Sequence, residues 1–234
     1  MTSWYPQNKD ELELELNNIL KSKIKPKEEI HGLIVPHAGY VYSGKITGKA
    51  FSLLKEKIPD KAIILGPSHY ESFFGIMSLS QIKTPLGEIK PDNELKLKKL
   101  DYEHSVENQV PFLQKLNPKI KITPIVVGGI TNEEAEKIAK EIAKIKGTYI
   151  FSTDLSHFLS YEKAVKKDKK TISIIENLDF PDINKIDACG KFPLNILMHL
   201  CKMNNWKPKL IEYKNSGDVT KEKNSVVGYS SFWF

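Results

Sequence analysis

The sequence contains no arginine, so all 35 of its basic side chains are lysines, set against 29 acidic ones for a net charge of +6. Guanidinium groups make the bidentate contacts that recognise guanine and phosphate, and lysine does not replace them. The lysines also alternate with glutamates along expected helix faces and do not form one basic block. We therefore expect no nucleic acid among the partners.

Cysteine and long apolar runs are scarce as well. The two cysteines, Cys189 and Cys201, are too few for a disulfide framework, which favours a reducing compartment. No stretch approaches the roughly 20 apolar residues of a membrane span. The amino-terminal segment MTSWYPQNKDELELEL lacks the basic stretch and apolar run of an export signal. We expect a cytoplasmic protein with no membrane partner.

The 234 residues contain no linker rich in proline, glycine or serine, so we expect one domain over residues 1–234. Apolar runs with strand character alternate with helical patterns. Helices are expected over 9–24 (before Pro26), 46–57, 106–116, 133–145, 162–178 and 193–203, and strands over 30–35, 62–65, 122–127, 149–152, 210–214 and 226–234.

This alternation predicts an α/β fold with a central, mostly parallel or mixed sheet flanked by helices. The strands at 30–35 and 62–65 are continuous runs of Val, Ile and Leu, typical of parallel strands buried on both faces. With the helix between them they form one β-α-β unit. We expect the two strands to be neighbours.

Histidines follow several of these strands. His37 ends GLIVPHAGY, His69 ends AIILGPSHY, and Asp154 and His157 lie in YIFSTDLSHF. In a parallel α/β sheet, residues beyond the carboxyl ends of the strands converge. Asp154 and His157 have the spacing of one face of a helical turn, and they could ligate a metal, orient a ligand or move protons. In the alternative, Asp154 or Ser156 only caps the next helix.

The two cysteines differ in position. Cys189 lies in DACGKFP, ahead of a helix that Pro193 is expected to open as its first residue. A thiol near a helix amino terminus ionises more readily, and the thiolate is the form that binds metals. Cys201 lies among apolar residues in the middle of that helix and is expected to be a buried core residue.

The segment EHSVENQVPF places ionisable groups at the start of one expected helix. His104 and Glu107 could supply acid and base chemistry at the edge of a cleft. A structural explanation is equally available, in which Ser105 caps the helix and Glu107 complements its dipole.

Eight ordered elements make the chain resemble the Memo family nearly from end to end. They are SWYP at 3–6, PHAGYVYSG, LGPSHY, EHSVENQVPFL, STDLSHF, CGKFP, NSGDVT and VVGYSSF. The resemblance implies the fold of the class III extradiol dioxygenases, non-haem Fe(II) enzymes that open catechol-like rings with O₂. It also implies a metal pocket formed by His37, His69 and Cys189, with Asp154 and His157 adjacent, and association with an AMMECR1-like protein and a radical SAM protein.

Three functions follow as hypotheses. The first is a mononuclear iron or copper redox enzyme, with His157 or His104 moving protons. Fe(II) is the expected metal, and Cu or Zn could also occupy the site. Its cysteine ligand departs from the two histidines and one carboxylate of the dioxygenases. The second is a binding or scaffold module that captures a peptide or a protein, for which Tyr40, Tyr42, Tyr70, Phe73 and Phe74 supply aromatic surface. The third is a hydrolase with Cys189 as nucleophile and His157 as base.

Overall fold

The computed structural model describes residues 4–21 and 28–234. Within them, eight strands form one mixed sheet in the order β6-β3-β7-β2-β8-β1-β10-β9. The strands are β1 (Gly32–Val35), β2 (Lys61–Pro67), β3 (Ile76–Leu79), β6 (Lys99–Leu100), β7 (Lys121–Val127), β8 (Thr148–Ser152), β9 (Lys209–Asn215) and β10 (Gly228–Trp233). The four central strands are mutually parallel. The strands that flank them, β3 and β10, run antiparallel to the centre.

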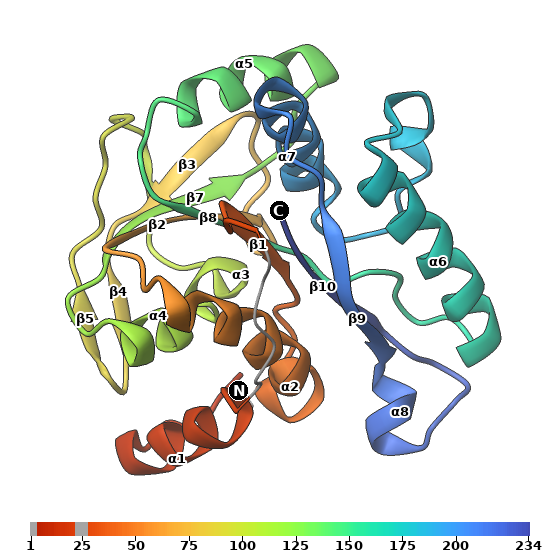
Figure 1. Cartoon of the computed structure of the whole chain (residues 1–234), viewed down its shortest axis with the longest axis horizontal. Coiled ribbons are helices and arrows are strands. Elements are labelled where there is room, and N and C mark those ends of the chain that lie inside the picture. Colours follow the sequence, from red (N-terminus) through yellow and green to blue (C-terminus); the bar gives the residue numbers. More distant parts are fainter. Residues whose placement is uncertain (1–3, 22–27) are drawn as a thin grey trace.

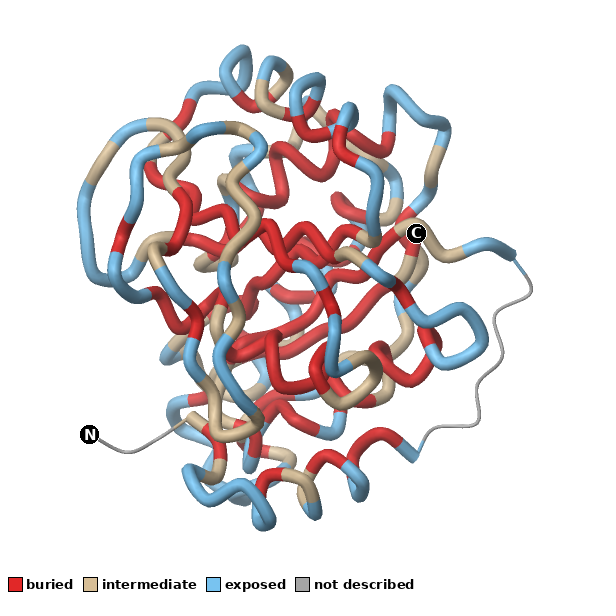
Figure 2. Tube along the Cα trace, turned by 90° about the vertical axis from the view of Figure 1, so that its left-hand side faces the viewer, coloured by how far each residue is buried: buried red, intermediate tan, exposed pale blue. Residues whose placement is uncertain are grey.

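Helices cover both faces of this sheet (Figure 1). One face packs against α5 (Asn132–Ile142), α6 (Tyr161–Asn177) and α7 (Lys191–Asn204), and the other packs against α1 (Lys9–Ile19), α2 (Tyr40–Phe51) and α4 (Val110–Leu116). Successive strand residues point to opposite faces, so Leu33 joins one core cluster and Ile34 the other. Buried backbone accordingly runs through the middle of the molecule, with exposed turns outside it (Figure 2).

The prediction of an α/β fold with a mixed sheet is confirmed, but one detail of its strand order is wrong. The strands that precede His37 and His69 are not neighbours, because β8 lies between β1 and β2 and pairs with both in parallel. The chain therefore places the strand that leads to Asp154 between the two strands that lead to the histidines.

Two predicted helices begin elsewhere than expected. The helix predicted over 46–57 starts directly after Gly39 as α2 and continues as a 3₁₀ turn over Ser52–Glu56. The helix predicted over 106–116 is two short ones, α3 (His104–Glu107) and α4. The first helix ends at Ile19, and its predicted last positions, 22–24, lie outside the described residues together with Pro26.

Several short elements were not predicted. They are β3, β6, the hairpin of β4 (Ile82–Thr84) and β5 (Gly87–Ile89), a 3₁₀ turn over Phe180–Lys185, and α8 (Ser216–Thr220). The strands among them have at most four residues, which is too short for a periodic pattern. Among the described residues, no helix combines the length and the apolar character that crossing a membrane requires.

Candidate metal centre

The predicted ligands lie where central strands end. His37, His69 and Asp154 come two residues after β1, β2 and β8, respectively. Because these strands are parallel, their carboxyl ends share one edge of the sheet. Cys189 reaches the same edge from the segment before α7, where its backbone N–H donates to the Asp154 carbonyl at 3.2 Å.

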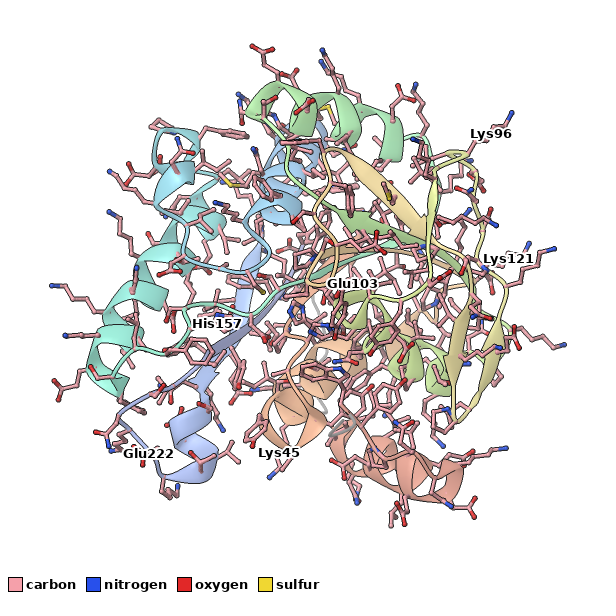
Figure 3. The ribbon with its side chains drawn as sticks, turned by 180° about the vertical axis from the view of Figure 1, so that it is seen from behind. Lys45, Lys96, Glu103, Lys121, His157 and Glu222 are labelled. Atoms are coloured by element: carbon pink, nitrogen blue, oxygen red, sulfur yellow. The ribbon has the colours of Figure 1, made fainter. Side chains whose placement is uncertain are left out.

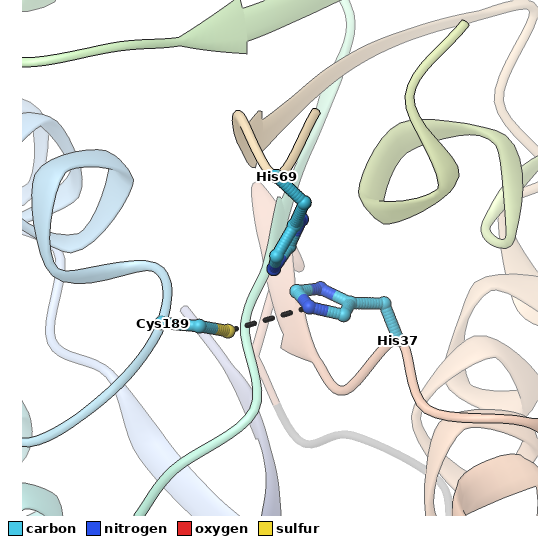
Figure 4. Close-up of side chains that lie close together, drawn as sticks. All are labelled: His37, His69 and Cys189. Carbon is cyan, nitrogen blue, oxygen red and sulfur yellow. Dashed lines mark hydrogen bonds between the residues drawn. The ribbon is translucent and has the colours of Figure 1, made fainter. Parts of the chain in front are cut away.

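The side chains of His37, His69 and Cys189 point toward one another (Figure 4). Their ligand atoms all lie within 4.8 Å of one another. Cys189 Sγ is 3.3 Å from His37 Nε2, and the two imidazole rings meet edge to face with centroids 5.1 Å apart. Two imidazole nitrogens and one sulfur form a ligand set suited to iron, zinc or copper. The fold thus brings together the three residues that the sequence indicates as metal ligands.

His37 is held by burial and by uncharged partners around its ring. Its residue is 3% exposed, and its backbone N–H donates to Asp154 Oδ1 at 2.9 Å. The ring Nδ1 lies 2.9 Å from Ser152 Oγ, which also accepts a hydrogen bond from Gln109 Nε2 at 3.0 Å. Burial, followed by the neighbouring histidines, lowers the pKa of His37 well below its usual value. The ring therefore stays uncharged and can offer a lone pair to a cation.

His69 is more open and is held by a carboxylate. Its backbone N–H donates to Glu103 Oε2 at 2.7 Å, and its ring Nδ1 lies 3.0 Å from Glu103 Oε1. Glu103 is 1% exposed and caps α3 by accepting the Ser105 N–H at 3.0 Å. Burial alone would raise the pKa of Glu103, but contacts with the side chains of His104 and His69 and with two backbone N–H groups lower it below its usual range.

The protonation state predicted for Cys189 is wrong for the metal-free protein. Burial, and then the nearby Asp154 carboxyl group, raises the pKa of the Cys189 thiol to about 12, despite a backbone N–H from Asp154 that donates to Sγ at 3.2 Å. The helix dipole is too weak here, because Cys189 precedes the cap residue Gly190 and Pro193 is the third residue of α7, not the first. Cys201 is fully buried, as predicted.

Asp154 and His157 both line the cavity above the ligands, but not on a helical turn. Residues 153–160 contain no helix, and α6 begins after the cap residue Ser160, so neither Asp154 nor Ser156 caps it. Asp154 is 5% exposed, its Oδ2 lies 4.0 Å from His37 Nε2, and burial raises its pKa. Cys189 Sγ lies 3.3 Å from the imidazole of His37, whereas the hydrolase hypothesis assigned the role of base to His157.

Of the two residues predicted in EHSVENQVPF, His104 lines the cavity and Glu107 does not. His104 is 6% exposed and stacks on Trp4, with ring centroids 4.2 Å apart. Glu107 accepts a hydrogen bond from Tyr5 Oη at 2.8 Å, and burial raises its pKa. The predicted Ser105 cap is also wrong, since Ser105 Oγ donates to the Pro67 carbonyl at 2.7 Å.

Glu103 is the site residue that sequence reasoning missed. With His69 and His104 it forms a second group whose ligand atoms lie within 4.8 Å of one another. Figure 3 places Glu103 and His157 near the middle of the molecule, whereas Lys45, Lys96 and Lys121 point outward. Glu103 carries no sequence signal of this role, because its partner His69 lies 34 residues away in the chain.

The cavity above the ligands has a volume of about 840 Å³. Its lining combines aromatic side chains with four histidines and two carboxyl groups, and no lysine lines it in the described part of the chain. The aromatic lining residues are Trp4, Tyr5, Tyr40, Tyr42 and Tyr229. Tyr70, Phe73 and Phe74 lie outside the lining, and Tyr70 and Phe74 are 54% and 92% exposed.

Comparisons with known proteins point to one family. The family described as "Memo-like protein" matches residues 2–233. A "MEMO1 family protein" of Sulfurisphaera tokodaii is 38% identical over 231 residues, covering 86% of this chain and 81% of the relative. Proteins of the same description from Methanococcoides burtonii and Aquifex aeolicus are 34% and 33% identical and cover 97% and 99% of this chain and 95% and 96% of their own lengths. The chain belongs to the Memo family.

Proposed function

We propose that the protein is a mononuclear metal-dependent redox enzyme related to the non-haem Fe(II) dioxygenases, with His37, His69 and Cys189 as its metal ligands. Fe(II) is the favoured metal and Cu is the redox-active alternative, whereas Zn could occupy the same ligands but would not support redox chemistry. The observation that carries the proposal is the convergence of the three ligand atoms beneath a cavity with aromatic walls. Bound Fe(II) would supply the one-electron chemistry that allows O₂ to react with an organic substrate.

The ligand separations fit a single cation. Bonds of about 2.0–2.1 Å to nitrogen and 2.3 Å to sulfur place the ligand atoms of one tetrahedral cation roughly 3.3–3.6 Å apart. Cys189 Sγ and His37 Nε2 already have this separation at 3.3 Å, and all three ligand atoms lie within 4.8 Å of one another, so side-chain adjustment would complete the set. His37 and His69 also line the cavity, so a substrate bound in the cavity would lie next to the metal.

The cysteine distinguishes this site from the two histidines and one carboxylate of the dioxygenases. The raised pKa of Cys189 means that the thiol keeps its proton until a cation replaces it. The thiolate would donate more charge to the metal than a carboxylate and would itself be open to oxidation.

Three further side chains face the region where a substrate would lie. His104 and His157 line the cavity and can accept or donate a proton there. The Asp154 carboxyl group accepts the backbone N–H of His37 and thereby helps to position His37. Glu107, which the sequence suggested for acid or base chemistry, lies outside the lining and is not assigned a part in the reaction.

The test is metal content after anaerobic loading with Fe(II). Wild type is expected to hold one iron per chain and His37→Ala essentially none. His199→Ala is the control, because His199 bonds Asn132 and lies outside the cavity lining. Equal iron in wild type and His37→Ala would refute the site. O₂ uptake by the loaded protein against a panel of catechols and thiols then tests the reaction and identifies its substrate class.

A scaffold function is the second candidate, and exposed aromatic side chains favour it. Phe74, Phe158 and Tyr70 are 92%, 76% and 54% exposed. The proposed partners are an AMMECR1-like protein and a radical SAM protein in the cytoplasm, where both cysteines would remain free. Capture of the AMMECR1-like protein that requires His69 but no metal, with no O₂ uptake by the iron-loaded protein, would favour the scaffold over the enzyme.

A further inference from the structure

We propose that Glu103 is a positioning residue that fixes the proton of the His69 ring on Nδ1 and thereby directs the Nε2 lone pair toward the metal. This inference rests on the proposed metal site, but its central claim concerns the metal-free protein. It gives a role to a buried carboxylate that the sequence motifs leave unassigned.

The carboxylate is itself held rigidly before any ligand arrives. Glu103 is 1% exposed, its Oε2 accepts the His69 N–H at 2.7 Å, and its Oε1 accepts the Ser105 N–H at 3.0 Å. Both donors are backbone groups, one after β2 and one at the start of α3. The position of the carboxylate is therefore set by the fold and not by side-chain packing alone.

The contact with the ring determines which nitrogen carries hydrogen. His69 Nδ1 lies 3.0 Å from Glu103 Oε1 with hydrogen-bond geometry. An ionised carboxylate only accepts hydrogen bonds, so the nitrogen that faces it must carry the proton. A neutral imidazole has one N–H, which leaves the lone pair on Nε2. Carboxylate partners of metal-binding histidines are known to orient the ring in this way.

His69 needs this partner more than His37 does. The His69 side chain is 29% exposed, whereas that of His37 is 3% exposed. Packing holds the His37 ring, and its Nδ1 meets the Ser152 hydroxyl, which can donate or accept and so permits either tautomer. The His69 ring has an open side, and the carboxylate supplies the constraint that packing does not.

A second contact of Glu103 supports a competing explanation. His104 Nδ1 lies 3.1 Å from Glu103 Oε1 without making a regular hydrogen bond. His69, Glu103 and His104 could instead hold a cation of their own. In that case Glu103 would be a metal ligand, the chain would bind a second metal ion, and our proposal would be wrong.

The experiment compares wild type, Glu103→Gln and the control Glu107→Gln. Both glutamates lie at α3, but Glu107 contacts Tyr5 and no imidazole ligand. An amide offers one acceptor oxygen, whereas Glu103 faces two backbone N–H groups and the His69 ring N–H. Oε1 accepts both the Ser105 N–H and the His69 ring N–H, so a glutamine NH₂ group in that position would face both donors, whereas an NH₂ group in the Oε2 position would face the His69 backbone N–H. In either orientation the neutral amide is a weaker acceptor for the ring N–H than the carboxylate, so the ring proton is held less firmly on Nδ1.

Two readouts are expected to change together. In metal-free protein at mildly alkaline pH, ¹H–¹⁵N spectra of the histidine rings should show His69 protonated at Nδ1 in wild type and Glu107→Gln, and a larger share of the Nε2-protonated ring in Glu103→Gln. In anaerobic Fe(II) titrations, Glu103→Gln should bind about 10- to 100-fold more weakly with one metal site per chain. Thermal melts verify that both variants fold.

Several outcomes would overturn the proposal. The proposal is wrong if the His69 ring of the wild type carries its proton on Nε2, and this test does not depend on whether Glu103→Gln folds. The proposal is also wrong if folded Glu103→Gln binds Fe(II) as tightly as wild type, or if Glu107→Gln loses as much Fe(II) affinity as Glu103→Gln. A second bound iron that is lost only in Glu103→Gln would contradict it as well. If wild type binds no metal, the proposed function fails while the ring spectra still decide the role of Glu103.

Discussion

The segments that follow β1 and β2 each present one imidazole to the same point, but they hold it by different means. After β1, His37 is 3% exposed and its ring contacts an uncharged serine hydroxyl. After β2, the His69 side chain is 29% exposed and its ring contacts the carboxylate of Glu103. A ligand can therefore be oriented by burial or by a charged partner, and this site uses one device on each side.

The electrostatic environments of His37 and His69 also differ. The β1 side lowers the pKa of His37 by burial and keeps the ring uncharged. The β2 side keeps the pKa of Glu103 below its usual range, so that a negative charge stays next to His69. A cation bound between them would be attracted mainly from the β2 side, where the negative charge of Glu103 lies.

The largest effect is expected from a change in backbone packing on the β2 side. A Cβ at Gly66 would overlap the Ser105 side chain, so Gly66→Ala should push α3 and Glu103 away from His69. Overpacking of this kind costs about 1–3 kcal/mol, and we expect the upper part of that range together with weaker Fe(II) binding. Urea unfolding and metal titration measure the two effects.

The control for this prediction lies on the β1 side. A Cβ at Gly39 would meet its nearest neighbour at 3.5 Å, an ordinary contact. Gly39→Ala should therefore cost less than about 1 kcal/mol, mainly through the cap of α2. An equal loss of stability in the two variants would contradict the proposed importance of the close contact between Gly66 and Ser105.

An intermediate effect is expected from removal of the uncharged partner of His37. Ser152→Ala leaves the His37 ring Nδ1 and one Gln109 N–H without a partner, which should destabilise the fold by about 1–2 kcal/mol. Because burial still holds the ring, Fe(II) affinity should fall less than in Glu103→Gln. Thermal unfolding and the same anaerobic titration provide the comparison.

A matched serine distinguishes a local effect from a general one. Ser52 is buried and donates to the Gly48 carbonyl at 2.7 Å, away from the cavity. Ser52→Ala should lower stability and leave Fe(II) affinity unchanged. If Ser152→Ala loses more Fe(II) affinity than Glu103→Gln, burial is not what orients His37, and the contrast between the two histidines is wrong.

The smallest expected effect is the pH dependence of stability that Glu107 causes. Its pKa is raised, whereas the pKa of Glu103 on the same β2 side is lowered. Burial raises the pKa of Glu107, so the folded state binds its proton more tightly than the unfolded state. The stability contributed by protonated Glu107 is present below the unfolded pKa and is lost as pH rises through the folded pKa. Glu107→Gln should remove this decline, and unfolding by urea at several pH values measures the difference.

A variant of Tyr5 provides the result that would contradict this prediction. Tyr5 donates to Glu107 at 2.8 Å and lowers its pKa, so Tyr5→Phe should steepen the same decline. If Tyr5→Phe and Glu107→Gln change the pH dependence in the same direction, Glu107 is not the group responsible.

Sequence patterns identified the elements that position the site and missed the contacts that tune it. The apolar runs of β1, β2 and β8 are continuous and unambiguous, and the residues just after them converge as predicted. The ionisation of Cys189 was predicted from its place before a helix. The opposite direction results from burial, which depends on segments far away in the chain.

The choice between Glu103 and Glu107 illustrates the same limit. Both belong to the segment that starts α3, and only the second, together with His104, was predicted from the sequence to supply acid and base chemistry. Only the crossing of α3 over the end of β2 turns Glu103 toward His69 and leaves Glu107 with Tyr5.

The amino-acid sequence by itself determined that His37, His69 and Asp154 follow buried strands, because hydrophobic pattern and local propensity act within a short stretch of chain. Tertiary structure alone decided that β8 lies between β1 and β2, that Glu103 supports His69, and that the Cys189 thiol keeps its proton. These depend on which distant segments pack together and on how much water they exclude, and no local pattern carries that information.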